Sequence, residues 1–95
     1  MSERDAYVQK IKAQLDHWNA EIDKLEAKSQ EASADAQIEY REQIDTLKQR
    51  RQEITEKLAA LKTAGDSAWE DMKSGVELAW NAMDSALRSA VSRFR

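Results

Sequence analysis

The sequence predicts an all-α fold, built as a long antiparallel helical hairpin of the coiled-coil type. The first indication is composition: the 95-residue chain has no Pro, only two Gly and 35% charged residues, as in long helices. The second is a heptad pattern of apolar residues in the N-terminal part. The third is an eleven-residue repeat headed by Trp69 and Trp80. The length allows one domain, which we place over residues 1–95.

The first helix is expected over residues 3–64. Its apolar residues alternate at steps of three and four, which is the pattern of a coiled-coil seam. The N-terminal seam consists of Val8, Ile11, Leu15, Trp18, Ile22 and Leu25. After a stretch of small residues and a stutter, the pattern resumes. Its second part consists of Tyr40, Ile44, Leu47, Ile54, Leu58 and Leu61.

The apolar pattern is weakest over segment 29–36, which has no large apolar side chain. It contains neither Gly nor Pro, and its alanines favour helix, so the main interpretation is a continuous helix. The alternative is an extra turn near 29–36. A turn there would produce three segments of similar length and a self-contained three-helix bundle.

A clearer break is predicted at Gly65. Glycine suits the left-handed position that follows a helix C-terminus, and Ser67 with Glu70 matches a capping box at the start of a second helix. Acidic residues crowd this start, and arginines lie near the C-terminal end, in agreement with the helix dipole. The second helix is therefore expected over residues 67–94.

The second helix carries a stripe rich in Trp and Met. At 100° per residue the stripe occupies a band of roughly 100°, the width of one amphipathic face. Its members are Trp69, Met72, Val76, Trp80, Met83, Leu87, Val91 and Phe94. The favoured interpretation is a helix core, because the polar face lacks the Lys/Arg excess of lipid-binding helices. The alternative is reversible binding to a membrane or another hydrophobic surface.

The unequal lengths of the two helices predict self-association. By rise per residue they measure about 90 Å and about 40 Å, so a folded-back hairpin leaves the Val8–Leu25 seam bare. At roughly 1.5–3 kcal/mol for each large apolar side chain, this seam requires a cover, and we expect a homodimer. The predicted association interface comprises Val8, Ile11, Leu15, Trp18, Ile22, Leu25, Trp69, Met72, Val76, Trp80, Met83 and Leu87.

Residues 4–28 and 68–80 resemble a family of small bacterial coiled-coil proteins known as stress-response proteins after a cyanobacterial member. The resemblance is most specific around four aromatic residues, Trp18, Tyr40, Trp69 and Trp80. It implies an all-helical, cytoplasmic protein with a connection to stress. It carries no catalytic residues that could be transferred to this chain.

Other features argue against chemistry and against nucleic acid. The net charge is −3, and both signs are interspersed without a basic face. The chain has no Cys, and its single His17 lies beside Trp18 and is expected to face solvent, so no metal or cofactor site is expected. Pairs of carboxylate side chains fit solvated helix faces, so we expect that the protein is not an enzyme.

Arg51 occupies a seam position in the first helix. It fits either a stem packed on the seam with its charge at the surface or a register-setting residue paired with an acid. No apolar run approaches the ~18 residues of a membrane span, and the charged N-terminus does not look like a secretory signal. We therefore expect a cytoplasmic, non-enzymatic coiled-coil protein that acts by self-association.

Overall fold

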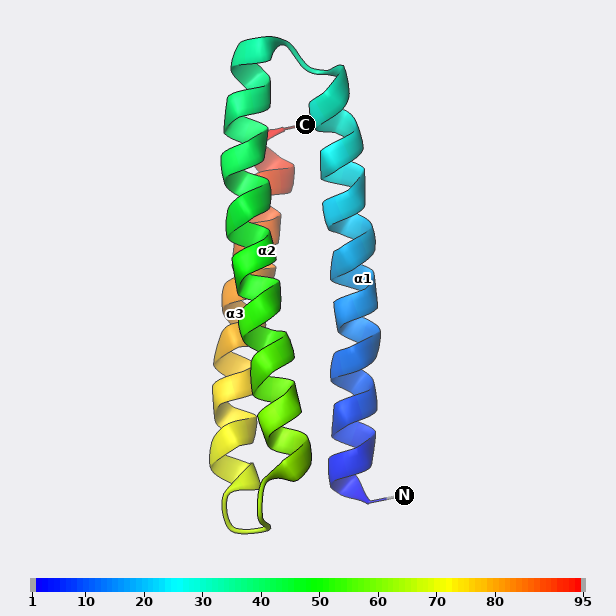
Figure 1. The fold of residues 1–95 in the computed structure, drawn as a ribbon, viewed down its shortest axis with the longest axis vertical. Helices are drawn as coiled ribbons and strands as arrows, with labels where there is room; N and C mark the ends of the chain where they lie inside the picture. Colours follow the sequence, from blue (N-terminus) through cyan, green and yellow to red (C-terminus); the bar gives the residue numbers. More distant parts are fainter. Residues whose placement is uncertain (1, 95) are drawn as a thin grey trace.

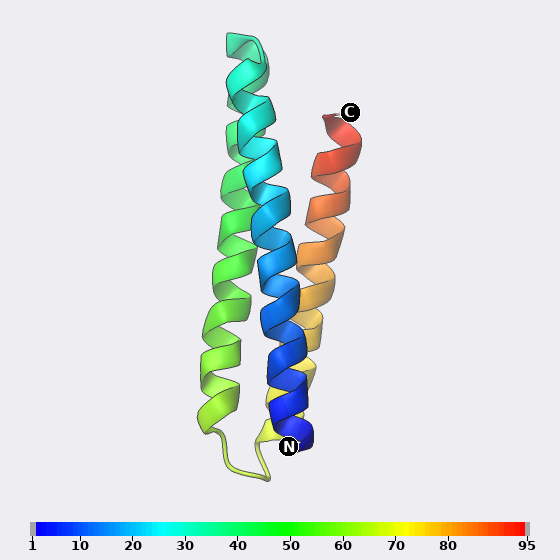
Figure 2. The same ribbon diagram turned by 90° about the vertical axis from the view of Figure 1, so that its right-hand side faces the viewer.

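The computed structural model describes residues 2–94 and contains three α-helices in that range. These are α1 (Glu3–Glu31), α2 (Ala34–Thr63) and α3 (Trp69–Arg93). They run up, down and up again in a rod with Cα extents of 51 × 20 × 18 Å (Figure 1). α2 packs against both other helices, while α1 and α3 run in the same direction (Figure 2). The all-α class is confirmed, and of the two arrangements considered the structure has the three-helix one.

The long N-terminal helix is interrupted at Ala32 and Ser33, inside segment 29–36. The Ser33 hydroxyl caps α2 by accepting a hydrogen bond from the Ala36 backbone N–H at 3.3 Å. The Gln37 side chain donates to the Ala32 carbonyl at 3.0 Å. The structure therefore has two helices in place of the continuous helix expected over 3–64, because a capped turn lets α2 fold back along α1.

This turn changes which residues are covered. The Val8–Leu25 seam, which a two-helix hairpin would leave bare, is buried within the chain except for Leu15, which is half-buried against the core. The buried core comprises Val8, Ile11, Trp18, Ile22 and Leu25 from α1, Tyr40, Ile44, Leu47, Ile54, Leu58 and Leu61 from α2, and Val76, Ala79, Met83, Leu87 and Ala90 from α3. At the end of the bundle, the Phe94 ring stacks on Tyr40 with centroids 3.8 Å apart.

α3 buries only part of its predicted apolar stripe inside the bundle. Val76, Met83 and Ala90 are completely buried, whereas Val91, at the edge of the predicted stripe, is 38% exposed. Compared with the predicted stripe, the buried face of α3 is rotated away from Val91 and includes Ala79 and Ala90. Small side chains at these positions let two helices approach closely.

The connection between α2 and α3 lies where it was predicted, but its details differ. No glycine among residues 2–94 has a positive φ, so the left-handed role assigned to Gly65 is wrong. The capping box at Ser67 is also wrong, since α3 begins at Trp69 and no side chain caps it. Instead, Arg4 of α1 donates to the Ala64 carbonyl at 2.6 Å. This distant guanidinium satisfies a carbonyl at the end of α2 that local sequence leaves without a partner.

Candidate interaction surface

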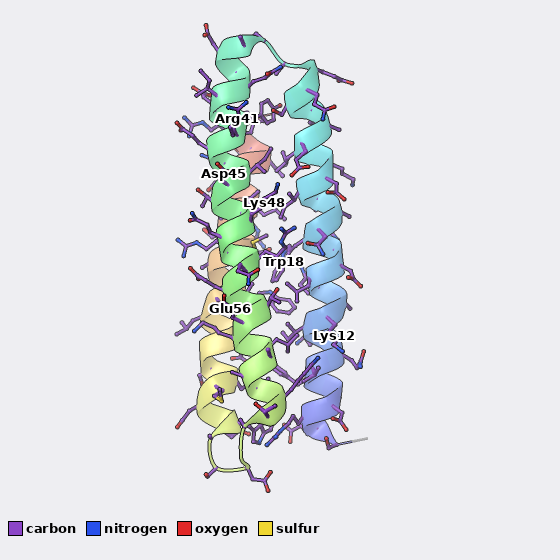
Figure 3. All side chains as sticks on the ribbon, viewed as in Figure 1. Lys12, Trp18, Arg41, Asp45, Lys48 and Glu56 are labelled. Carbon is purple, nitrogen blue, oxygen red and sulfur yellow. The ribbon has the colours of Figure 1, made fainter. Side chains whose placement is uncertain are left out.

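Four aromatic side chains fill the space between the parallel helices α1 and α3. Tyr7 and Trp69 meet edge to face with ring centroids 6.4 Å apart. Trp18 and Trp80 meet in the same way at 5.1 Å. Trp18 is completely buried inside the bundle (Figure 3), whereas the other three rings are half-buried. We refer to Tyr7, Trp69 and Trp80 as the aromatic seam.

Three cationic side chains lie over the rings of the aromatic seam. The Arg4 guanidinium is 5.6 Å from the centroid of the Trp69 ring, and the Lys10 ammonium is 5.7 Å from that of Trp80. The Lys73 ammonium lies between two rings, 5.2 Å from Tyr7 and 5.4 Å from Trp69. Each contact is in the range of a cation–π attraction, worth about 0.5–1 kcal/mol at exposed sites.

Acidic side chains lie close to these cations and to Tyr7. Glu3 lies 4.0 Å from the Lys73 ammonium, and Asp66 lies 3.3 Å from Arg4. Burial raises the pKa of Tyr7, and the negative charge of Glu77 raises it further. The aromatic seam therefore has three cations and three acids around it and no excess of either sign.

A small groove opens along the middle of the aromatic seam. It has a volume of about 270 Å³ and is lined by Tyr7, Lys10, Ile11, Glu77, Trp80 and Asn81. This volume lies below the range of about 300–1,000 Å³ that is usual for small-molecule pockets. The groove is thus slightly smaller than a usual small-molecule pocket.

A larger groove, of about 630 Å³, lies between α2 and α3. It is lined by Glu53, Glu56, Lys57, Ala60, Asp71, Met72 and Gly75. Most of these side chains are charged and exposed, as on a solvated helix flank. A Cβ built at Gly75 would meet only the end of the Lys57 side chain, at 3.9 Å, so this glycine does not mark a close approach of two helix backbones.

The α1–α2 face is held by polar contacts. Arg51 donates to the Asn19 side-chain carbonyl at 2.9 Å, so its partner on the other helix is an amide rather than the acid that was considered. The Lys48 ammonium lies 2.7 Å from Glu26. The neighbouring Lys12 ammonium lowers the pKa of the exposed Lys62 by a hydrogen bond and by charge repulsion.

The residues predicted for the association interface are mostly used inside the chain. Eight belong to the core: Val8, Ile11, Trp18, Ile22, Leu25, Val76, Met83 and Leu87. Leu15, Trp69, Met72 and Trp80 are half-buried and pack against it. Of the predicted set, Trp69 and Trp80 are brought together with aromatic partners on α1.

The sequence analysis missed Tyr7 and the three cations. A signal for Tyr7 was present, because Tyr7 and Trp18 are eleven residues apart, as are Trp69 and Trp80. Equal spacing on two parallel helices places the rings opposite each other in two pairs. The cations carry no such signal, because lysines and arginines occur on every exposed face of the chain.

Three further observations concern His17, metal ligands and membrane-spanning helices. His17 is exposed, as its position beside Trp18 predicted. Among residues 2–94, no group of three His, Cys, Asp or Glu side chains is placed to hold a metal ion. No helix in that range has the length and apolar character needed to span a bilayer.

Comparison with known proteins does not extend these observations. No protein-family model, curated protein or solved structure matches the chain. The resemblance to bacterial stress-response coiled coils therefore remains a prediction from the sequence.

Proposed function

We propose that this chain is a non-enzymatic structural protein that associates with a second copy of itself through the aromatic seam. The observation that carries the proposal is the incomplete burial of Trp69 and Trp80, together with Tyr7, along one side of the bundle. Tyr and Trp are enriched at the centres of protein interfaces, where they provide contact area at low entropic cost. By its sequence resemblance, tolerance of stress is the proposed setting.

The charges around the aromatic seam favour a second copy as its partner. A two-fold dimer places the same patch on both sides of the interface. A cation of one copy can then contact an acid of the other copy, and the symmetry forms the same contact a second time. A patch that holds both cations and acids suits this arrangement, because Lys10 of one copy can meet Glu77 or Glu3 of the other. An anionic lipid surface would instead attract a patch with a Lys/Arg excess.

A dimer is therefore expected from the aromatic seam and not from the Val8–Leu25 seam. The Val8–Leu25 seam is covered by α2 and α3 of the same chain and requires no partner. The proposal now depends on side chains at the surface of a folded bundle. Such an interface forms between folded monomers, so association should be reversible and should follow mass action.

Charge reversal at the surface tests this proposal without disturbing the core. Lys10→Glu removes a cation over Trp80 and makes the patch acidic, so the dimer dissociation constant should rise at least about tenfold, an interface effect of about 1.4 kcal/mol. Lys57→Glu is the matched control, because it makes the same charge change on the exposed α2–α3 flank. Its dissociation constant should stay within about twofold of the wild type. Sedimentation equilibrium measures both.

Two results would contradict the proposal. One is a wild-type monomer at all concentrations up to the millimolar range. The other is equal weakening by Lys10→Glu and Lys57→Glu, which would mean that total charge rather than this patch governs association. Co-sedimentation of the monomer with vesicles of phosphatidylcholine and phosphatidylglycerol would instead favour the surface-binding alternative.

A further inference from the structure

The turn between α1 and α2 consists of two residues with extended backbone, whose φ angles are also compatible with a helix. Ala32 has φ −83° and ψ 163°, and Ser33 has φ −63° and ψ 162°. Both φ angles already lie in or near the α-helical range, so that rotating two ψ angles to about −42° would continue the helix. Neither residue is Gly or Pro, and Ala34 and Ala36 follow. Alanine is the residue that favours helix most strongly.

The apolar faces of α1 and α2 would line up if the turn became helical. Counted through the turn at 100° per residue, the buried positions from Trp18 to Leu47 fall within a band of about 120°. These positions are Trp18, Ile22, Leu25, Tyr40, Ile44 and Leu47, with Ala32 and Ala36 between them. A straight helix over residues 3–63 would therefore present one continuous apolar face.

The contacts between α1 and α2 have a symmetry that suits two copies. The pairs Arg4–Ala64, Asn19–Arg51 and Glu26–Lys48 are arranged nearly symmetrically about residue 35. In two antiparallel straight helices related by a two-fold axis near residue 35, each of these pairs would re-form between chains. The register of the folded hairpin is thus also the register of an antiparallel dimer.

We propose that the chain has a second state, a dimer in which Ala32 and Ser33 are helical and two copies exchange α1. In this state α1 of each chain packs against α2 and α3 of the other and buries the same core residues. The occupant of the α1 site is thus α1 of a second copy. Exchange of an identical element is a low-cost route to a dimer, because only the hinge differs between the two states. This exchange uses the core and does not depend on the aromatic seam.

Two substitutions in the turn should move the equilibrium in opposite directions. Ala34→Pro places proline at the first position of α2, where its fixed φ and missing N–H are tolerated, and Ser33 before it has the extended backbone that proline requires. Proline inside a straight helix is strongly unfavourable. Ser33→Ala removes the hydroxyl that caps α2, which a continuous helix does not need.

The experiment refolds wild type and both variants at high protein concentration and measures mass and maximum dimension. The exchanged dimer contains helices about 90 Å long, whereas a side-by-side dimer through the aromatic seam keeps the length of the 51 Å rod. The chain has no Cys, so a Glu26→Cys, Lys48→Cys pair can be joined by a short bismaleimide. Cross-linking stays within one chain in the monomer and in the seam dimer, and joins two chains in the exchanged dimer.

We expect Ser33→Ala to raise the amount of the long, interchain cross-linked dimer at least about tenfold over wild type, and Ala34→Pro to lower it at least a hundredfold. Circular dichroism must show that Ala34→Pro remains a folded helical monomer. The proposal is overturned if Ser33→Ala forms no dimer longer than the monomer. It is also overturned if the long dimer persists in Ala34→Pro, or if its cross-link stays within one chain. A short dimer that is abolished by Lys10→Glu supports association through the aromatic seam, and it refutes exchange if it is the sole dimer that Ser33→Ala forms.

Discussion

Replacement of Arg4 by Met should destabilise the fold by about 2 kcal/mol, and the structure indicates which of its contacts is responsible. Arg4 donates a charge-assisted hydrogen bond to the Ala64 carbonyl, lies over Trp69 and pairs with Asp66. A hydrogen bond from a charged group contributes about 1.5–3 kcal/mol, and the lower end applies here because the Arg4 side chain is 21% exposed. The contact with Trp69 adds about 0.5 kcal/mol. Asp66 is fully exposed, so its ion pair adds little.

Urea unfolding followed by circular dichroism measures this loss, and the melting temperature should fall by about 10 °C for a domain of this size. Met retains most of the length of the arginine stem, so lost packing is kept small. Asp66→Asn is the control that removes only the exposed ion pair, and it should change the stability by less than about 0.5 kcal/mol. If Asp66→Asn costs as much as Arg4→Met, the carbonyl contact is not what closes the end of α2, and the reasoning fails.

Three further predictions concern the turns and one titrating group. Ser33→Ala should lower the stability of the monomer by about 1 kcal/mol through loss of a cap, whereas Ser67→Ala should lie within about 0.3 kcal/mol of wild type because no side chain caps α3; urea unfolding compares them. Gly65→Ala should stabilise the protein by about 0.4–1 kcal/mol, since φ is not positive and nothing lies within 4 Å of an added Cβ; a drop in melting temperature would contradict this. The raised pKa of Tyr7 means that the folded state holds this proton more tightly, so its contribution is present below about pH 10 and is lost as pH rises through the folded pKa. Tyr7→Phe should therefore lose less stability than wild type between pH 9 and pH 11, and parallel pH profiles would exclude the effect.

Helix type and the identity of the core could be predicted from the sequence because the chain repeats its apolar residues at helical spacing. Leu25 and Tyr40, on either side of the first turn, are both buried as their spacing predicted. The turn itself was only an alternative, since segment 29–36 contains no residue that forces a break. Its signal was Ser33, an N-cap residue followed by Asp35 in the first turn of α2, and this signal competes with three strong helix formers around it.

The second turn shows the opposite limit. Gly65 and Ser67 carry strong local signals, yet the structure uses neither. The end of α2 is satisfied instead by Arg4, which lies 60 residues away in the chain. Local sequence cannot predict such a partner, because the pairing exists only once α1 lies beside the loop. For the same reason, the cations over the aromatic seam could not be distinguished from other surface lysines.

The two aromatic contacts require the same spacing between rings on α1 as on α3. A slip of α3 along α1 by one turn, about 5.4 Å, would separate Tyr7 from Trp69 and Trp18 from Trp80 together. Only a slip of eleven residues brings aromatic rings opposite each other again, and it restores one pair instead of two. An insertion or deletion between the rings of one helix should consequently be tolerated only when the other helix changes by the same number of residues. The two aromatic pairs thus fix the axial register of α1 and α3, although these helices do not follow one another directly in the chain.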